Sequence, residues 1–527
     1  MSGDLAEVAD KSVRGSLLLF LGEAGSTAIL AVGSILVARF LGPEHYGVYS
    51  ISLAVPAIII SLIGLGLDET IVRFSAKLRS ENRTSQLLSF MKSAITFRLA
   101  VSLIAWLACF LSSDILASTL LNRPEAGFYV KLASLIIIFQ ALFNLLYNLY
   151  VGLDRYGSGA ATKISMSIVK SVSAPILVII GLGVIGAVLG HVLGFAISTI
   201  VAISMLYLGP YRSLSSAVNA GGEYRGSFTG DLKTMIGYGL PLYMSSLMLL
   251  LVEQYRLILL AHNVSDLEIG NFQAAGNFAT LIVIISTPIS MALFPAFSKL
   301  DPSGEDVRRA FHYSVKYTAM LIVPSALFTI LMSRSLVEVI YGHKYQLAPS
   351  YLSLYATIYL CSAIGSTVLD YFFNAIGKTV VNLKATTIYV TSFIPLSIAL
   401  TPLYGVIGLI LSILTSFTLK VVYGAYTARN RVRAPIGFKN SASILVASFA
   451  AAITTLPLAL SQQMPNYLNL LLGGIIYLAT YLTILPITKG LDKTDIEIFR
   501  KLFSNYGKLK PIIDLVMRYE SKLMEMI

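Results

Sequence analysis

The sequence predicts an all-α polytopic membrane protein, and three observations lead to this fold class. Of its 527 residues, 56% are hydrophobic and only 13% are charged, whereas about a quarter of a typical soluble domain is charged. The mean hydropathy is +0.77. The apolar stretches are continuous and about 20 residues long, which favours helices over a barrel of alternating strands. This composition excludes a soluble multidomain protein and a disordered chain.

Fourteen apolar stretches are long enough to be transmembrane helices. We expect the first to be an anchor rather than a cleaved signal peptide, because it is long and contains Glu23. Tight turns at 181–183 and 401–403 are expected to separate two close pairs of stretches. The fourteen stretches are 16–38, 47–67, 90–111, 128–151, 162–182, 184–208, 235–260, 270–296, 314–333, 350–372, 381–400, 404–426, 442–462 and 468–488.

The distribution of lysine and arginine predicts the orientation. If the N-terminus is inside, 31 of the 39 Lys and Arg residues fall in inside segments and about 5 in outside loops, as the excess of basic residues on cytoplasmic loops predicts. We therefore expect a multi-pass protein of the cell (plasma or inner) membrane with both termini cytoplasmic. The net charge of +12 is then explained by anionic membrane lipids, and no nucleic-acid partner is expected.

An internal duplication is visible at an offset of about 223 residues. Segment 47–78 resembles 270–300, and the motif at 183–186 (GVIG) returns at 405–408. An offset of six spans is even, so the sequence predicts two six-helix lobes related by a pseudo-two-fold axis along the membrane normal, plus two extra helices. The matched glycines are Gly47 with Gly270, Gly183 with Gly405, and Gly152 with Gly377.

These spans define the expected organisation of the chain. The tail is expected to contain an amphipathic helix from Pro511 onward, with an apolar stripe that suits the inner leaflet. The predicted parts are an N-terminal lobe with spans 1–6 (1–208), a cytoplasmic linker (209–233), a C-terminal lobe with spans 7–12 (234–427), spans 13–14 (428–488) and a cytoplasmic tail (489–527).

No sequence motif indicates a catalytic centre, a metal or a cofactor. The GLGVIG run at 181–186 fits a dinucleotide-binding pattern, but it opens a membrane helix instead of following a strand. Gly186, Gly190 and Gly194 indicate close helix packing instead. The Gly377-Lys378-Thr379 run lacks the first glycine of a phosphate loop. We therefore predict that the chain is not an enzyme.

Ionisable residues inside the predicted spans are the candidate substrate-binding residues. Burying such a group at the bilayer centre costs about 2.5–3.5 kcal/mol on insertion scales, so it must face water or a partner. Arg98 and Lys170 could also snorkel or bond between helices. Glu253 and Arg256, three residues apart, could simply pair. The set is Glu23, Arg98, Lys170, Glu253 and Arg256, with His191 expected to be a packed histidine.

The excess of positive charge in this set favours an anionic cargo. Arginine and lysine suit a diphosphate or an acidic sugar. A lipophilic cation would require carboxylates and aromatic rings instead. We therefore expect a hydrated, electropositive cleft that carries a polar headgroup.

An ordered series of segments resembles the polysaccharide and O-antigen flippases of the multidrug/oligosaccharidyl-lipid/polysaccharide exporter superfamily. Segment 38–50 (ARFLGPEHYGVYS) is similar to the end of the first helix of that family. Segment 237–242 (GYGLPL) resembles the start of its seventh helix, and 293–298 (LFPAFS) and 341–345 (YGHKY) resemble later signatures. The family often has Asp-Arg near the end of helix seven, where this chain has Tyr255-Arg256.

The resemblance implies a fourteen-helix transporter that flips a lipid-linked oligosaccharide, on a polyprenyl phosphate or diphosphate, to the outer leaflet by alternating access. It implies a role in surface polysaccharide or glycan assembly, with glycan-assembly enzymes as further partners. Cavity cations would hold the headgroup, for which Arg98, Lys170 and Arg256 are positional candidates.

Other functions compete with this one. The nearest are an ion-coupled exporter of drugs or small cations and a peptidoglycan lipid II flippase. A membrane glycosyltransferase or polymerase, and a non-transporting scaffold for glycan enzymes, belong to different classes.

Overall fold

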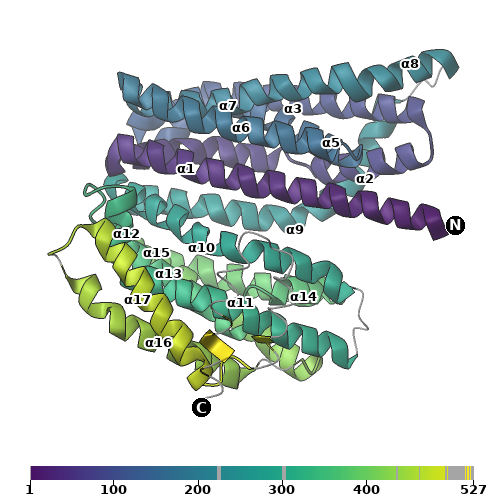
Figure 1. Cartoon of the computed structure of the whole chain (residues 1–527). Coiled ribbons are helices and arrows are strands. Elements are labelled where there is room, and N and C mark those ends of the chain that lie inside the picture. Colours follow the sequence, from purple (N-terminus) through teal and green to yellow (C-terminus); the bar gives the residue numbers. More distant parts are fainter. Residues whose placement is uncertain are drawn as a thin grey trace. The chain divides into compact units, whose positions relative to one another are not determined.

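The computed structural model describes residues 2–221, 227–298, 304–434, 437–461, 463–492, 495–496, 517, 519–521 and 523. The regular structure within these ranges is helical (Figure 1). The helices are α1 (Ser2–Leu62), α2 (Leu67–Ser80), α3 (Thr84–Thr119), η1 (Pro124–Ala126), α4 (Gly127–Ala133), α5 (Ile136–Gly152), α6 (Tyr156–Leu177), η2 (Val178–Leu182), α7 (Gly183–Leu206), η3 (Tyr207–Tyr211), α8 (Arg212–Gly221), α9 (Phe228–Asn263), α10 (Asp266–Ser298), α11 (Glu305–Leu331), α12 (Ser333–Ile340), α13 (Ala348–Ala356), η4 (Thr357–Ile364), α14 (Leu369–Ala375), α15 (Thr379–Arg431), α16 (Phe438–Leu460) and α17 (Asn466–Ile487).

The length and apolarity of these helices make the chain a multi-pass membrane protein. Eight helical segments of the described residues are long and apolar enough to span a bilayer, or nine with the bent pair 348–364 and 369–375. Three of the eight are 42, 61 and 53 residues long, about twice what one crossing needs. The exact number of spans stays a prediction.

Each of these three long segments is interrupted by a glycine with non-helical torsion angles. The break in α1 is at Gly42 (φ 76°, ψ 169°), between the first two predicted spans. Gly183 (φ 51°, ψ −131°) lies between α6 and α7, at the turn expected at 181–183. Gly405 (φ 56°, ψ −134°) interrupts α15, a few residues after the turn expected at 401–403.

Gly183 and Gly405 are equivalent positions of the repeat, and their torsion angles agree within a few degrees. This backbone conformation is practically restricted to glycine. The duplicated GVIG motif therefore marks the same sharp break in both halves of the sequence.

A second local structure also repeats, and it corrects one expected match. The turn from α5 to α6 is closed by bonds from the N–H groups of Leu153, Asp154 and Arg155, and the α14–α15 turn has the same bonds 223 residues later. Asp154 (φ 52°) and Gly377 (φ 73°) take the left-handed position. Gly377 is thus equivalent to Asp154, and its expected match with Gly152 is wrong by two residues.

The chain forms two compact units, Met1–Gly270 and Asn271–Ile527. In the first unit, α6 packs along both α1 and α7, and α5 lies against α2 and α7 (Figure 1). The glycines of α7 permit this packing, because a Cβ at Gly190 would lie 2.3 Å from the Cα of Ala174, and one at Gly194 2.6 Å from the Cβ of Lys170. The small-residue packing predicted for this helix is confirmed.

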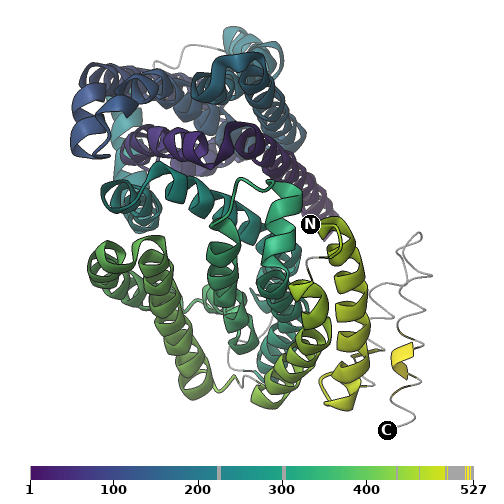
Figure 2. The same ribbon diagram turned by 90° about the vertical axis from the view of Figure 1, so that its left-hand side faces the viewer.

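In the second unit, α16 and α17 lie side by side (Figures 1 and 2), and α16 also packs on α11. After α17, Asp492 and Asp495 are held by the buried ammonium of Lys316. Lys316 Nζ lies 3.0 Å from Asp492 Oδ2 and 2.6 Å from Asp495 Oδ2. Tyr317 donates to the other oxygen of Asp495 at 2.9 Å. The predicted tail helix lies mostly outside the described residues.

Candidate functional site

A row of polar side chains follows the contact between α1 and α6 in the first unit. At one end, Glu23 of α1 lies 3.0 Å from the ammonium of Lys163 on α6. Tyr147 of α5 donates a hydrogen bond of 2.7 Å to the same carboxylate oxygen, and Lys163 Nζ lies 5.1 Å from the Tyr147 ring centroid. Three helices therefore contribute to one charged cluster, which we call the Glu23 cluster.

A second cluster, the Lys170 cluster, lies on the same face of α6. Lys170 Nζ is 3.3 Å from His191 Nε2 of α7, and His191 Nδ1 is 3.0 Å from the hydroxyl of Tyr49 on α1. If the ammonium of Lys170 donates to Nε2, the neutral imidazole carries its proton on Nδ1 and donates to Tyr49. His191 is thus a bonded histidine, as the sequence predicts, but its partner is a candidate binding residue.

The two clusters are joined by hydroxyl groups. Lys163 and Lys170 are seven residues apart, so they lie on one face of α6 about 10 Å apart along its axis. Between them, Ser167 is hydrogen-bonded to Ser26 of α1. Ser171 donates to the Ile29 carbonyl at 2.9 Å. The row continues over two turns of helix inside an apolar segment.

The exposure of the Glu23 cluster shows what surrounds it. The side chains of Glu23 and Lys163 remain 37% and 27% exposed, although both residues lie within predicted spans. An ion pair in contact with hydrocarbon would be costly. Contact of the exposed part of this pair with water or another polar group would avoid that cost.

Arg98 lies in a different environment. Its side chain is only 3% exposed and donates a hydrogen bond of 2.8 Å to the carboxylate of Asp68 at the start of α2. It also donates a hydrogen bond of 3.1 Å to the Ile63 carbonyl just after α1. These bonds fasten the α1–α2 turn to α3, which corresponds to the interhelix bonding considered from the sequence.

Glu253 and Arg256 form the pair that their spacing predicts. Arg256 Nη1 lies 3.0 Å from Glu253 Oε2 on α9. The arginine side chain is 11% exposed, and the glutamate side chain is 60% exposed. The described contacts do not bring this pair into the polar row on α6.

The second unit has a different charged pair near its repeated turn. Lys420 Nζ of α15 lies 2.8 Å from Asp370 Oδ2 of α14. The Asn382 amide donates a hydrogen bond of 2.8 Å to the Asp370 carbonyl. At the repeat offset, Lys170 corresponds to Phe393 and Lys163 to Thr386. The lysine row of the first half is therefore not duplicated.

Sequence reasoning missed Lys163, Tyr147 and Tyr49. Lys163 stands at the start of the predicted span 162–182, so its position alone groups it with the basic residues of the preceding inside loop. Its signal was the seven-residue spacing to Lys170, which places both lysines on one helix face. The two tyrosines carried no signal, because their partners are more than 120 residues away in sequence.

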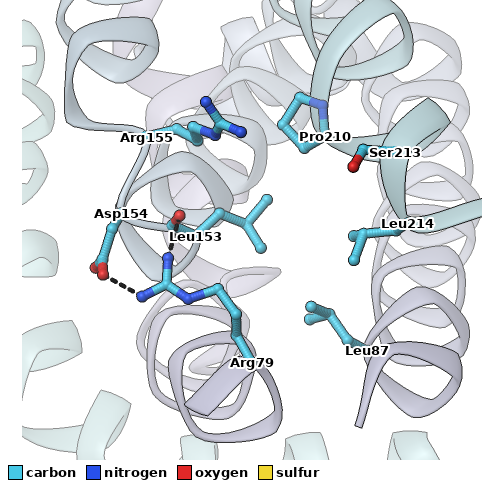
Figure 3. Close-up of a pocket in the computed structure, with 8 residues that line it drawn as sticks. All are labelled: Arg79, Leu87, Leu153, Asp154, Arg155, Pro210, Ser213 and Leu214. Atoms are coloured by element: carbon cyan, nitrogen blue, oxygen red, sulfur yellow. Dashed lines mark hydrogen bonds and ion pairs between the residues drawn. The ribbon is translucent and has the colours of Figure 1, made fainter. Parts of the chain in front are cut away.

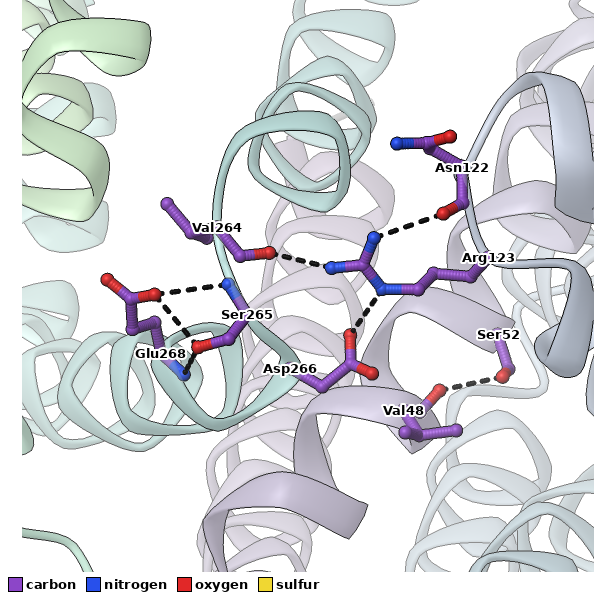
Figure 4. Close-up of polar contacts among 8 residues, drawn as sticks. All are labelled: Val48, Ser52, Asn122, Arg123, Val264, Ser265, Asp266 and Glu268. Carbon is purple, nitrogen blue, oxygen red and sulfur yellow. Dashed lines mark hydrogen bonds and ion pairs between the residues drawn. The ribbon is translucent and has the colours of Figure 1, made fainter.

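A third polar group joins two loops of the first unit that are predicted to lie outside (Figure 4). Arg123 donates a hydrogen bond of 3.1 Å to the Asp266 carboxylate and one of 2.7 Å to the Val264 carbonyl. Ser265 caps α10 through a reciprocal bond with Glu268. Among the described residues, no group of His, Cys, Asp and Glu could hold a metal ion.

Two family models match the sequence. A model described as "Polysaccharide biosynthesis protein" matches residues 36–349. A model described as "Lipid II flippase MurJ" matches residues 272–482. The first match covers more than half of the chain.

Curated relatives show identities of 22–23%. The succinoglycan biosynthesis transport protein ExoT of Rhizobium meliloti is 23% identical over 340 residues, and the match spans 64% of each chain. The probable flippase AglR of Haloferax volcanii is 22% identical over 78% of this chain and 82% of AglR. The lipopolysaccharide biosynthesis protein WzxC of Escherichia coli is 22% identical over 72% of this chain and 73% of WzxC.

Solved structures share the fold. The lipid II flippase MurJ in an inward closed conformation has a TM-score of 0.70 at 17% identity, covering 89% of this chain and 98% of MurJ. A MATE family transporter of the MOP superfamily in an inward-facing conformation has a TM-score of 0.63 at 16% identity, covering 77% of this chain and 95% of the transporter.

Proposed function

Because the chain belongs to the polysaccharide biosynthesis protein family, we propose that it flips a lipid-linked oligosaccharide from the cytoplasmic to the outer leaflet. The names of the relatives support this function, since they include a succinoglycan transport protein and a probable flippase. The cargo would serve surface polysaccharide or glycan assembly. A headgroup with many hydroxyls cannot cross hydrocarbon unaided, because each unsatisfied polar group costs several kcal/mol.

The observation that carries the proposal is the polar row on α6. Lys170 would bind the phosphate or diphosphate of the cargo, because an ammonium is a strong donor to phosphate oxygens. His191 and Tyr49 hold the lysine in place. Glu23, Lys163 and Tyr147 would meet the sugar hydroxyls nearer the predicted inner side, while the polyprenyl tail stays in the bilayer.

The other predicted binding residues take supporting roles in this scheme. Arg98 would position the α1–α2 turn through Asp68. Arg256, held by Glu253 on α9, would add positive charge. We assign the headgroup to Lys170, because it lies in the polar row and is bonded to His191 of α7.

Alternating access would carry the headgroup from one side to the other. We propose fourteen spans in two six-helix lobes related by a pseudo-two-fold axis, with both termini cytoplasmic. The matching breaks at Gly183 and Gly405 and the matching turns at Asp154 and Gly377 support the duplication. Helix breaks at fixed points let parts of a lobe tilt as rigid bodies.

Lipid II is a second candidate cargo. The model named for the lipid II flippase matches residues 272–482. Lipid II is also a saccharide on a polyprenyl diphosphate, so the same lysine would serve both. A cation exporter is less well supported, since the polar row contains two lysines and a single carboxylate.

The test is translocation in liposomes. Purified protein is reconstituted, and a fluorescent lipid-linked oligosaccharide is followed by its loss of accessibility to an added quencher. We expect faster exchange than in empty vesicles, and at least a tenfold loss in Lys170→Met, which keeps a long, unbranched side chain but removes the charge. Lys384→Met, an exposed lysine on α15, is the matched control. Wild-type exchange no faster than in empty vesicles would reject the function.

Parallel cargoes decide between the candidates. Lipid II and a cationic dye are tested in the same vesicles. Acceleration of lipid II alone would assign the second function, whereas uptake of the dye driven by a proton or sodium gradient would assign cation export.

A further inference from the structure

A cavity of about 330 Å³ lies in the first unit, away from the polar row on α6. Its volume is within the range of small-ligand sites. Three segments bound it: the end of α2 with the start of α3, the α5–α6 turn and the η3–α8 segment (Figure 3). We call it the inner-side cavity, because all three segments are predicted to be cytoplasmic. Its lining residues are Arg79, Leu87, Leu153, Asp154, Arg155, Pro210, Ser213 and Leu214.

The two arginines of the cavity differ in their bonding. The guanidinium of Arg79 is bonded to the Leu153 carbonyl and to the carboxylate of Asp154, so its charge is already balanced. Within the described ranges, the side chain of Arg155 makes no hydrogen bond or ion pair. Figure 3 shows it above Leu153, on the side facing Pro210. Arg155 is therefore the cation available to a ligand.

The remaining wall is apolar. Leu87 and Leu153 belong to the buried core of this unit, and Leu214 packs against the same cluster. Ser213 adds one hydroxyl at the rim (Figure 3). One free guanidinium, one hydroxyl and three leucines suit an amphiphile that has an anionic head and a hydrocarbon portion.

The neighbouring segment provides access from the bilayer. η3 is a π-helical segment that contains Pro210, and such irregular turns occur often at functional sites. Just before this proline, Tyr207 and Leu208 are 62% and 71% exposed, as expected of side chains in contact with lipid. Lys92 Nζ lies 5.7 Å from the ring centroid of Tyr211, which adds positive charge beside the cavity.

We propose that the inner-side cavity binds the headgroup of an anionic phospholipid of the cytoplasmic leaflet. Arg155 pairs with the phosphate, Ser213 donates to a phosphate oxygen, and the leucines contact the first part of an acyl chain. Basic pockets on the cytoplasmic side of membrane proteins are suited to such headgroups. The inference goes beyond the proposed function, because this lipid stays bound and is not the cargo.

The experiment measures lipid binding rather than flipping. Delipidated full-length protein in detergent is titrated with phosphatidylglycerol, and the occupancy of the first bound lipid is followed by native mass spectrometry. Phosphatidylcholine tests the need for net negative charge, and soluble glycerol phosphate tests whether the phosphate alone suffices. Melting temperatures from the same titrations give a second readout, because a ligand that binds only the folded state stabilises it.

Three variants make the result specific. Arg155→Gln removes the free charge, and Ser213→Trp fills the cavity without changing charge. Arg309→Gln is the control, because Arg309 is an exposed arginine that pairs with Glu305 on α11 in the other unit. We expect the affinity for phosphatidylglycerol to be at least fivefold weaker in both cavity variants. The affinity of the control variant should equal that of the wild type.

Several outcomes would overturn the proposal. They are unchanged phosphatidylglycerol binding in Arg155→Gln, equal affinity for phosphatidylcholine, and full displacement of the lipid by glycerol phosphate at equal concentration. The last result would identify a site for free phosphate instead. Should Ser213→Trp fail to fold, the Arg155→Gln titration decides alone.

Discussion

Gly47 of α1 faces the backbone carbonyl of Asp266 at the start of α10 so closely that a Cβ at Gly47 would lie 1.9 Å from the carbonyl oxygen. Gly270 makes the reciprocal contact, since its Cβ would lie 1.7 Å from the Pro43 oxygen. Residues 43 and 266, like 47 and 270, differ by the offset of the sequence repeat. The two glycines therefore make matching close contacts at positions one repeat apart.

Adding one carbon at this contact should therefore destabilise the protein. We expect Gly47→Ala to cost about 1–3 kcal/mol, the usual penalty for overpacking, and to lower the melting temperature by several degrees. Gly25→Ala is the control on the same helix, because nothing lies within 4 Å of its added Cβ. Equal melting temperatures for the two variants would contradict the close contact.

The Arg98–Asp68 pair should act mainly on stability. Arg98→Ala leaves a carboxylate without its buried partner, which typically costs about 3–5 kcal/mol. The double variant Arg98→Met, Asp68→Leu should recover most of this loss, because both charges are removed together. Thermal melting of the single and double variants gives the coupling energy.

Translocation by the same variants then separates two roles of Arg98. We expect the double variant to regain flipping together with stability, as a positioning role requires. A stable double variant without translocation would show that the guanidinium itself binds the headgroup.

The Glu23–Lys163 pair offers a charge-swap test. Glu23→Lys alone should impair both folding and translocation, because it places two ammonium groups next to each other. Adding Lys163→Glu should restore the melting temperature, since the ion pair is re-formed in reverse. We expect translocation to stay reduced, because the order of charges along the polar row has changed. Full recovery of translocation would mean that the pair is only structural.

We expect the packing of the tail around Glu520 to depend on pH. Burial raises the pKa of Glu520 from its ordinary value of 4.5 to about 7, since its side chain is only 3% exposed. Between pH 4.5 and 7 the unfolded chain loses this proton before the folded chain does. The stability of the docked tail should therefore fall as pH rises through this window.

Glu520→Gln should abolish this pH dependence. The variant stays neutral, so we expect it to melt higher than the wild type at pH 8 and equally at pH 4.5. Glu305→Gln, an exposed carboxylate on α11, should leave the pH profile unchanged. Hydrogen exchange in the peptide that contains Tyr519, which is bonded to Thr483, reports whether the tail itself has loosened.

Local features of the fold were predictable from sequence, and long-range ones were not. The Glu253–Arg256 pair follows from a spacing of three residues on one helix, and it is confirmed. The break at 181–183 was visible because glycines stand there. The turn expected at 401–403 contains Pro402, but a membrane helix tolerates proline, and the backbone departs from helical angles at Gly405.

The candidate site shows the same limit. Lys170 stood out because a lysine in the middle of a span is costly. Its bond to His191 depends on the register of α6 against α7, which the small residues at Gly190 and Gly194 set. The pairing of Glu23 with Lys163 joins residues 140 positions apart, so no local pattern could reveal it.

The repeated turns and glycine breaks show that the two halves share backbone geometry while they differ in side-chain chemistry. The α5–α6 and α14–α15 turns close with the same bonds, and Gly183 and Gly405 break their helices with nearly the same torsion angles. Positions 163 and 170 hold lysine, whereas positions 386 and 393, one repeat later, hold threonine and phenylalanine. A duplicated scaffold can therefore keep its bends while the residues that it presents diverge.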